Sequence, residues 1–595
     1  MKHLIALLAA LACVSAPASA GNADAGFLPL QDPIVVYNNW SAYDELSDNV
    51  LQTEQLAMKQ LDELLRLRRR GVRFDYYMMD AFWYAKEGAY RTWRKATWPN
   101  GPDGWLARCK ENGIKPGLWF GTNMLVQLEA APEWQDSLSK KGWTACFFKG
   151  GFMPHFMQTL QMWYDRGIRM FKFDFVDFTA APPDVEASMK PEEIRARNET
   201  AFREALRKFR EKNPGVVLVA FNGFGGDLET TSGPFPFQSP IDLRWLTVFD
   251  SIYSGDPRPS DVPMMNFWRS QDVYGDHMVR RFEDSGLPLE RIDATSVMYG
   301  TTGTIYYRKT NAWKSGVLLM LARGGWVNTI HGNLELIDDR KAAWMARVFQ
   351  LYLRMQSLGR TKTFGGIPGE VQPYGFASLD RNGALYTVVN PAQTVSRIEL
   401  PRLSQEQSGA GPGRLVFCDA GFRPELAGNS IALGPEQMAV IGFGKYARPE
   451  YGLGTEDEVV IPQSIEPVAA VFDARGSHAV EGSVAAPGGG SLRIVMQQKT
   501  PDGHIRRTWA GGPPKGENMG RVFRIEAWQN CNPLRVRVNY DKVIWSGLAW
   551  GVGEVEGFAP GAAVSIRCTS SEKDEVKLEA KVYRVRYREP RGEPR

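Results

Sequence analysis

Short apolar runs alternate with amphipathic helical stretches across residues 33–358, and this alternation constrains the fold more than any other feature. Apolar runs bounded by turn residues predict strands, and apolar residues at three- and four-residue steps predict the intervening helices. The strands are expected at residues 35–37, 74–80, 116–120, 144–148, 170–175, 216–222, 246–253, 292–298 and 326–331, and the clearest helices at 51–70, 157–166, 191–212 and 340–357. Alternation of this length predicts an α/β fold, a (β/α)8 TIM barrel, with a doubly wound sheet as the competing topology.

The pattern changes after residue 358, where short alternating runs are broken by Gly, Asn and Pro. Residues 360–447 predict an antiparallel β-domain, and residues 458–595 predict an accessory β-sandwich domain. The polar segment 448–457 is interpreted as the linker between them. The chain of 595 residues is too long for one hydrophobic core. We therefore expect a catalytic barrel at 33–358, followed by two all-β domains.

The N-terminus has the pattern of an export signal. Lys2 and His3 precede the apolar run 4–14, and Ala-Ser-Ala at 18–20 fits a cleavage site. Residues 1–20 are therefore predicted to be a signal peptide, and the protein to be secreted or periplasmic. No other run approaches the ~18 consecutive apolar residues of a membrane span.

Five cysteines follow residue 20, and none of them has a partner at metal-ligand spacing. No metal or other cofactor is therefore expected. In an exported protein, Cys531 and Cys568 are the favoured disulfide pair, because both fall in the last β-rich segment. The alternative is that all five are buried free thiols.

The formal net charge is only +4 and no long basic run occurs, which argues against nucleic acid as a partner. Eighteen tryptophans are many for this length. Flat rings stack on sugar faces or fill a core, and for Trp528, Trp545 and Trp550 in the last segment core packing is favoured over sugar binding.

Charged and polar residues close several of the predicted strands. Active sites of (β/α)8 barrels lie at the C-terminal ends of the strands, which directs attention to Asp80, Lys172, Asp174, Asn222 and Asp256. Lys172 and Asp174 are two residues apart and share one strand face. Burying both charges is costly without a purpose, and an ammonium beside Asp174 favours its ionised form. The competing interpretation of each carboxylate is a helix cap.

Retaining glycoside hydrolysis uses two carboxyl groups about 5–5.5 Å apart, one as nucleophile and one as acid/base. Asp174 and Asp256, on different strands of one barrel rim, fit these two roles. Asp261 is the rival for the acid/base; Asp256 is preferred because it follows the apolar strand run directly.

Five segments in order resemble the clan D glycosidases, the α-galactosidase superfamily of glycoside hydrolase families 27 and 36. They are PIVVYNNWSAY at 33–43, YMMDAFW at 77–83, GIKPGLW at 113–119, FKFD at 171–174 and YSGD at 253–256. The resemblance covers residues 33–360. It implies a retaining α-glycosidase with a C-terminal β-domain, in which Asp174 is the nucleophile and Asp256 the acid/base. The layout is nearer family 27, because no large β-domain precedes the barrel.

The resemblance also implies a sugar site, whose expected walls are Trp40, Asp80, Trp83, Trp119, Lys172, Asn222 and Arg258; His331 either lines this pocket or belongs to the core. Two departures from the family pattern affect which sugar the site is expected to bind. The family's Asp pair on the second strand is here Asp80-Ala81, and its Arg after the fifth strand is absent, with Arg244 or Arg258 as possible substitutes.

The expected substrate is an oligosaccharide, polysaccharide or glycoconjugate with a terminal α-linked sugar, α-galactose by resemblance. Because of the two departures, β-L-arabinopyranoside and α-N-acetylgalactosaminide stay open. An inactive sugar-binding barrel is the alternative from another class. A metal-dependent hydrolase would need clustered His ligands, and the chain has six histidines in all.

Overall fold

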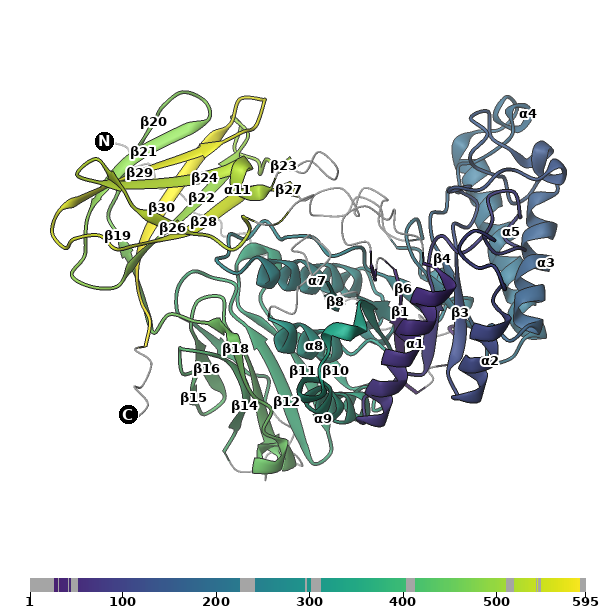
Figure 1. Ribbon diagram of the computed structural model, residues 1–595, viewed down its shortest axis with the longest axis horizontal. Helices are drawn as coiled ribbons and strands as arrows, with labels where there is room; N and C mark the ends of the chain where they lie inside the picture. The colour runs from purple at the N-terminus through teal and green to yellow at the C-terminus, as the bar shows by residue number, and fades with distance from the viewer. Residues whose placement is uncertain are drawn as a thin grey trace, which may run out of the picture.

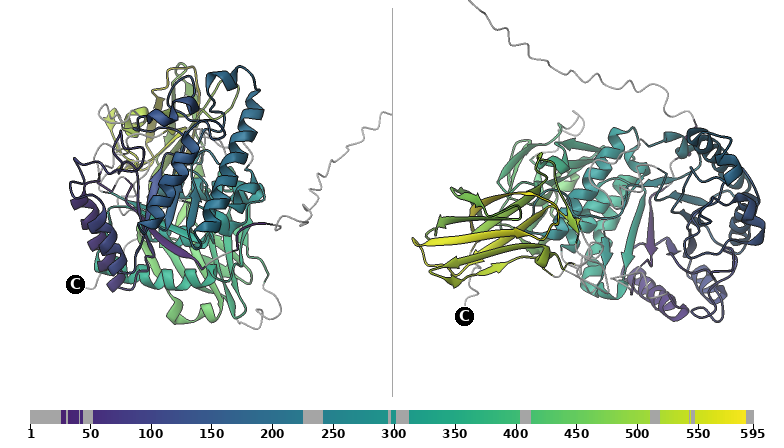
Figure 2. Two further views of the ribbon diagram at one scale, coloured as in Figure 1. Left: turned by 90° about the vertical axis from the view of Figure 1, so that its right-hand side faces the viewer. Right: turned by 90° about the horizontal axis from the view of Figure 1, so that it is seen from above.

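The computed structural model describes residues 26–29, 32–40, 42–43, 52–224, 241–294, 297–300, 312–402, 412–509, 518–541, 543 and 547–588. The predicted signal peptide and Trp545 lie outside these residues. The described chain is elongated, with the N-terminal half of the barrel and the last β-domain at opposite ends of its long axis (Figures 1 and 2).

One parallel sheet organises the first part of the chain. Its strand order is β7-β6-β5-β4-β3-β2-β1-β9-β8. The strands are β1 Ile34–Asn38, β2 Tyr76–Met79, β3 Lys115–Phe120, β4 Met170–Phe173, β5 Val217–Ala220, β6 Ser251–Tyr253, β7 Ile292–Asp293, β8 Val297–Tyr299 and β9 Val327–Gly332. Three residues separate β7 from β8. Since β7 pairs with β6 and lies against β9, while β8 pairs with β9, the strands β7 and β8 bring the two sides of the sheet together.

This arrangement is the (β/α)8 barrel that the alternation predicts, and the doubly wound alternative is wrong, since that topology has an open sheet. Each of the larger helices follows one of the strands (Figure 1). They are α1 Glu54–Arg69, α2 Asp103–Glu111, α3 Phe152–Asp165, α5 Pro191–Lys212, α7 Phe267–Asp284, α8 Trp313–Ala322 and α9 Asp339–Gln356, with the short α4 Pro183–Glu186 before α5. The four predicted helices are confirmed, although α3 begins five residues before its expected start.

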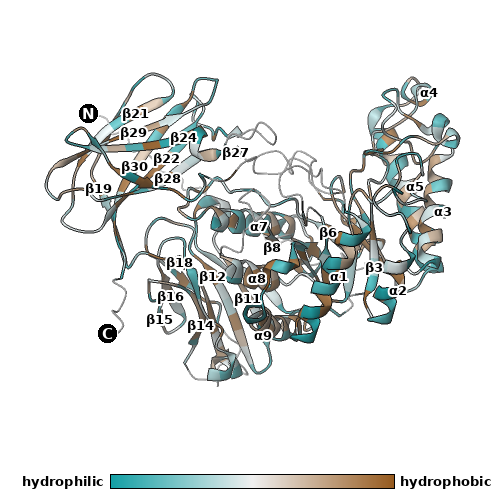
Figure 3. Cartoon of the chain, in the orientation of Figure 1, coloured by the Kyte–Doolittle hydropathy of each residue, from teal (hydrophilic) through white to brown (hydrophobic). Residues whose placement is uncertain are grey.

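Helix α1 shows why these segments form helices and how they face the barrel. The Thr53 hydroxyl caps its N-terminus by accepting a hydrogen bond from the Leu56 amide at 3.1 Å. Leu61, Leu64 and Leu65 lie on one face and are buried against the sheet. In Figure 3 the outer helices α1 and α5 carry many hydrophilic residues, whereas α8 is largely hydrophobic because it is enclosed by protein.

Three strand predictions in the barrel are wrong in part. Residues 292–298, expected as one strand, contribute to the two separate strands β7 and β8, which pair with β6 and β9 respectively. Residues 144–148 form only isolated bridges, Met124 with Thr144 and Leu138 with Ala145. The segment is apolar because it is buried in a loop. There the Asn198 side chain accepts a hydrogen bond from the Phe147 amide at 2.7 Å. Residues 246–253 divide into the end of a short 3-10 helix, Leu243–Thr247, and strand β6.

The middle part of the chain is an antiparallel β-structure with one parallel addition. A six-stranded sheet has the order β10-β11-β12-β17-β14-β18, beside a small sheet β13-β16-β15. Their bounds are β10 Thr361–Gly365, β11 Tyr374–Asp380, β12 Gly383–Val389, β13 Ser396–Glu399, β14 Arg414–Ala420, β15 Glu425–Ala427, β16 Ser430–Leu433, β17 Met438–Gly444 and β18 Gly454–Val460. Strand β18 pairs in parallel with β14, so the predicted linker 448–457 is in part a strand of this sheet.

The last part consists of two five-stranded sheets, ordered β19-β30-β22-β28-β26 and β20-β21-β29-β24-β25, and the pair β23-β27. The bounds are β19 Ser464–Val468, β20 Val471–Ala474, β21 Ala479–Ala485, β22 Ser491–Lys499, β23 Thr508–Trp509, β24 Phe523–Gln529, β25 Asn532–Pro533, β26 Arg535–Arg537, β27 Gly547–Leu548, β28 Trp550–Glu556, β29 Ala563–Ser570 and β30 Lys577–Arg586, with the short helix α11 Met519–Val522. We call this part the C-terminal sandwich.

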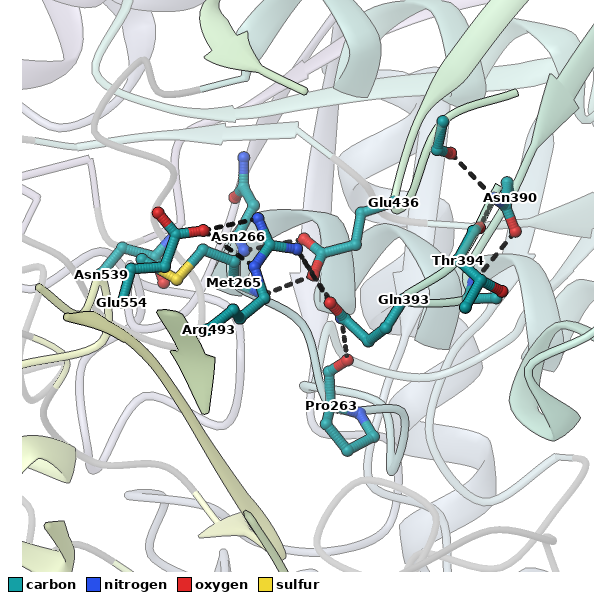
Figure 4. Close-up of polar contacts among 12 residues, drawn as sticks. Pro263, Met265, Asn266, Asn390, Gln393, Thr394, Glu436, Arg493, Asn539 and Glu554 are labelled. Atoms are coloured by element: carbon teal, nitrogen blue, oxygen red, sulfur yellow. Dashed lines mark hydrogen bonds and ion pairs between the residues drawn. The ribbon is translucent and has the colours of Figure 1, made fainter. Parts of the chain in front are cut away.

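A buried ion-pair cluster ties the three parts together (Figure 4). Arg493 on β22 pairs with Glu554 on β28 at 2.7 Å and with Glu436, in the turn between β16 and β17, at 3.6 Å. Glu436 in turn accepts hydrogen bonds from the amides of Met265 and Asn266, just before α7 of the barrel. The sandwich, the middle sheets and the barrel therefore share one desolvated cluster of charges.

The predicted Cys531–Cys568 disulfide is wrong, because all five described cysteines are free thiols. Cys568 is buried on β29, where it pairs with Ile525 of β24. The end of β24 is four residues, or about 13 Å, from Ile525, and Cys531 lies beyond that end. A disulfide requires Cα atoms within about 7 Å. The alternative of five buried thiols is also not met, since Cys531 is exposed.

Candidate active site

A cavity of ≈ 160 Å³ opens where the parallel strands end. Asp80 follows β2, Lys172 lies in β4, Asp174 directly follows β4, Asn222 lies just beyond β5, and Asp256 lies three residues beyond β6. Pockets for drug-sized ligands measure about 300–1,000 Å³, so this cavity suits a smaller unit such as a single sugar ring. The full lining is Trp40, Asp80, Ala81, Phe82, Trp119, Val126, Lys172, Asp174, Phe175, Phe221, Asn222, Tyr253, Asp256, Met298 and His331.

Asp174 is the most constrained side chain of the cavity. It is 6% exposed, and four N–H groups hold its carboxylate. The Trp119 indole donates to Oδ2 at 3.0 Å, while the Phe175 amide and both the amide and the side chain of Asn222 donate to Oδ1 at 2.9–3.2 Å. Phe175 has a φ of 50°, which turns the chain sharply out of β4 at this point. The fold therefore fixes the direction in which this carboxylate points.

The pKa of Asp174 reflects competing influences. Burial raises it above the ordinary value, and this outweighs Lys172 and the Trp119 hydrogen bond, which lower it. Taken alone, Lys172 favours the ionised form of Asp174, as expected. The net pKa of Asp174 is nevertheless raised, because the carboxylate is almost wholly desolvated.

Lys172 makes its direct ion pair with Asp80 rather than with Asp174. Its Nζ lies 2.8 Å from Asp80 Oδ2, and the Asn38 side chain donates to the same oxygen at 2.7 Å. Burial lowers the pKa of Lys172, but Asp80 and Asp174 together raise it above its ordinary value. Lys172 is thus a buried ammonium, also 4.0 Å from the centre of the Phe221 ring, at the floor of the cavity.

The structure distinguishes the two carboxylates considered for the acid/base. Asp256 lines the cavity, and its Oδ1 accepts a hydrogen bond from the Tyr253 hydroxyl at 3.2 Å. Asp261 is instead ion-paired with Arg507 of the C-terminal sandwich. Of these two, Asp256 is the one placed to reach a ligand beside Asp174.

Two expected wall residues lie elsewhere. Trp83 is 1% exposed and belongs to the barrel core, where its indole donates to the Trp119 carbonyl at 2.9 Å and its ring packs against Trp163. It follows a strand, but the chain turns there and directs the ring inward. Arg258 is not among the lining residues; its guanidinium lies 5.7 Å from the Trp509 ring of the sandwich.

The other expected walls, Trp40, Asp80, Trp119, Lys172 and Asn222, do line the cavity, and so does His331. Arg244, the other possible substitute for the missing Arg, is exposed and paired with Asp242. Sequence reasoning missed several apolar walls. Phe175 and Phe221 could have been found as the direct neighbours of Asp174 and Asn222, whereas Val126 and Met298 carry no chemical signal of their own.

Asp293, at the end of β7, was also missed. It is almost completely buried, and burial raises its pKa to about 7, although Lys172 lowers it. His331, on β9, is buried too; burial and Lys172 hold its pKa well below the ordinary value, so it is neutral. Among the described residues, no group of three His, Cys, Asp or Glu side chains is arranged to hold a metal ion.

The Asp293→Asn variant is expected to lose a pH dependence of stability. A carboxyl whose folded pKa is about 7 and whose unfolded pKa is near 3.9 is more protonated in the folded state between these values. The wild type therefore loses stability as the pH rises from about 4 to 7, by at most about 1.4 kcal/mol per pH unit. Urea unfolding at pH 5 and pH 8 measures this effect. The free energy of unfolding of the variant, relative to that of the wild type, should be larger at pH 8 than at pH 5. A constant difference would contradict this assignment.

The similarity of this chain to known proteins is a similarity of fold. No protein-family model and no curated protein matches the chain. Among solved structures, the α-galactosidase of Lactobacillus brevis aligns with a TM-score of 0.50 and 11% identity, covering 70% of this chain and 55% of that one. A family 36 α-galactosidase of Geobacillus stearothermophilus aligns with a TM-score of 0.47 and 14% identity, covering 69% and 55%.

The chain thus spans about 55% of the length of these two structures. At such identities the likeness shows the fold, a TIM barrel followed by β-domains. The expected family 27 layout stays a prediction. Of the helices that the structure describes, none combines the length and apolar character needed to cross a bilayer.

Proposed function

We propose that the protein is a retaining α-glycosidase that uses Asp174 as nucleophile and Asp256 as acid/base. One observation carries the proposal. A carboxylate oriented by four N–H donors lies in a cavity that suits a single sugar ring, and a second carboxylate, from another strand, lines the same cavity. A helix cap needs neither the cavity nor the second carboxylate.

The reaction proceeds in two displacements. An Asp174 oxygen bonds to the anomeric carbon while the bond to the leaving oxygen breaks, and that oxygen takes the proton of Asp256. Asp256, now a carboxylate, removes a proton from water. The water oxygen bonds to the anomeric carbon, the ester to Asp174 breaks, and the sugar leaves with its original anomeric configuration.

The surroundings of Asp174 suit this sequence. Burial raises its free energy as a free carboxylate, which favours bond formation to carbon. Lys172 supplies positive charge nearby while its own direct partner, Asp80, keeps it in place. The four donors hold Asp174 in one orientation, so that little rearrangement is needed for attack.

For the substrate, we propose a terminal α-galactoside-like sugar. The resemblance in sequence and the α-galactosidases among the structures of similar fold support this choice. Ala81 stands where a second carboxylate would bind sugar hydroxyls, and it lines the cavity. A sugar that differs from galactose is therefore the second candidate: a β-L-arabinopyranoside, which lacks the O6 hydroxyl group, or an α-N-acetylgalactosaminide, which carries an acetamido group at C2.

A parallel screen tests the proposal. Aryl α-galactoside, β-L-arabinopyranoside, α-N-acetylgalactosaminide and α-glucoside are incubated with the full chain, and the first-formed product is followed by proton NMR. We expect hydrolysis of at least one substrate with the anomeric configuration retained. Inversion would rule out a nucleophilic Asp174, since retention arises from its covalent intermediate. Sugar binding without hydrolysis across the panel would favour the inactive barrel.

A further inference from the structure

The loop that carries Asp256 is held by the C-terminal sandwich. This loop, residues 254–266, connects β6 to α7. The Trp550 indole donates to the Ser260 carbonyl at 2.8 Å, and the Gln497 side chain donates to the Asp261 carbonyl at 3.3 Å. Arg507 forms the ion pair with the Asp261 carboxylate. The sandwich is therefore in direct contact with the segment that positions the acid/base.

The same edge of the sandwich presents an exposed aromatic ring. Trp509, on β23, is 43% exposed, whereas Trp550, on β28, is fully buried. The strand pair β23-β27 lies on the side of the sandwich nearest the barrel (Figure 1). Because this ring lies near Arg258 of the loop that carries Asp256, its exposed part is available to contact a sugar.

Arg258 links this ring to the catalytic loop. It is two residues beyond Asp256, so their Cα atoms are at most about 7.6 Å apart. Its guanidinium lies 5.7 Å from the centre of the Trp509 ring. Its Nε is buried and has no hydrogen-bond partner among the described residues. An Arg258 N–H without a described partner, near both the loop of Asp256 and the Trp509 ring, leaves hydrogen-bonding capacity unused at this point.

We propose that Trp509 and Arg258 form a subsite for the leaving group, contributed jointly by the sandwich and the barrel. The inference rests on the proposed function and adds the substrate class. The acid/base protonates the leaving oxygen, so groups just beyond Asp256 face the departing part of the substrate. An indole face and a guanidinium suit a carbohydrate leaving group, whose ring stacks and whose hydroxyls accept hydrogen bonds. The preferred substrate is thus an oligosaccharide rather than a simple glycoside.

Calorimetric titration of the full chain tests this subsite, in an Asp174→Asn background that prevents turnover. The ligands are methyl α-galactoside, which has one ring, and raffinose, which has two further rings on the leaving side. We expect raffinose to bind about tenfold more tightly, the equivalent of about 1.4 kcal/mol. In the Trp509→Ala variant this preference should fall to about twofold or less, or about 0.4 kcal/mol.

Two further variants make the result specific. Trp509→Phe keeps a flat ring and is expected to retain most of the preference. Val471→Ala removes another exposed apolar side chain of the sandwich, on β20, and is expected to retain all of it. An unchanged preference in Trp509→Ala would overturn the subsite.

The outcomes also separate the subsite from the proposed function. A preference for raffinose that depends on Trp509, in a chain whose wild type hydrolyses no glycoside in the screen, would overturn the proposed function and leave Trp509 as part of a sugar-binding surface. Hydrolysis by the wild type without any preference for raffinose would overturn the subsite and leave the proposed function standing. Binding of neither ligand would contradict both.

Discussion

Replacement of Asp174 by glycine is expected to lower kcat at least about 10⁴-fold, because the reaction loses its covalent intermediate. The change should affect kcat far more than the binding of a substrate analogue, since the walls formed by Trp40, Trp119 and Phe221 remain. The circular dichroism spectrum should match that of the wild type. Activity within tenfold of the wild type would contradict the assignment of the nucleophile.

Azide distinguishes a lost nucleophile from other kinds of damage. In Asp174→Gly, azide can occupy the vacated position and attack once from that side. The expected product is a glycosyl azide of inverted configuration. In Asp256→Gly, azide acts on the intermediate from the opposite side, and the azide product should retain the configuration.

Asp261→Asn is the matched control among the carboxylates. Asp261 lies on the same loop as Asp256 but is ion-paired with Arg507. If Asp256 is the acid/base, Asp256→Gly should lower turnover of a poor leaving group by about 10²–10⁴-fold. Asp261→Asn should change turnover much less and give no azide product. The reverse ranking would reassign the acid/base to Asp261.

The Lys172→Met variant is expected to be less stable than the wild type by about 3–5 kcal/mol, because it leaves the Asp80 carboxylate buried without its ion-pair partner. Asp80 is 2% exposed and cannot turn to solvent without disturbing β2 and the Asn38 contact. The double variant Lys172→Met/Asp80→Asn removes both charges and should recover most of the loss. Urea unfolding measures both effects, and a single variant within about 1 kcal/mol of the wild type would contradict a buried ion pair.

The same substitutions should move the acidic limb of the pH profile in opposite directions. Asp174 must be ionised to attack, and Lys172 lowers its pKa whereas Asp80 raises it. Lys172→Met therefore shifts the acidic limb of kcat/KM to higher pH, and Asp80→Asn shifts it to lower pH. A structural role of the pair alone would change stability without these opposed shifts.

The barrel was predictable because strand and helix periods differ, and each period appears repeatedly in residues 33–358. The relation between Lys172 and Asp174 was also predictable, because alternate residues of a strand share a face. The partner of Lys172 was not. Asp80 is 92 positions away in sequence, and only the pairing of β2, β3 and β4 brings the two together.

Other differences have similar physical causes. The apolar run 144–148 has the composition of a strand, but its amides are satisfied in a loop, in part by Asn198. The polarity of residues 454–457 suggested a linker, yet a strand at the edge of a sheet can carry charges on its exposed face. Arg258 has an ordinary position in the sequence, and its neighbour Trp509 comes from a domain some 250 positions later.

The unpaired cysteines have a practical consequence. Because no disulfide joins the described residues, a thiol reductant should leave the folded state of this part unaffected, and the chain can be produced in a reducing host compartment. Cys531 is the one exposed thiol among the five described, at the turn beyond β24, while burial raises the pKa of Cys109 and Cys568 and leaves them unreactive. A maleimide dye would therefore attach selectively at that turn of the sandwich.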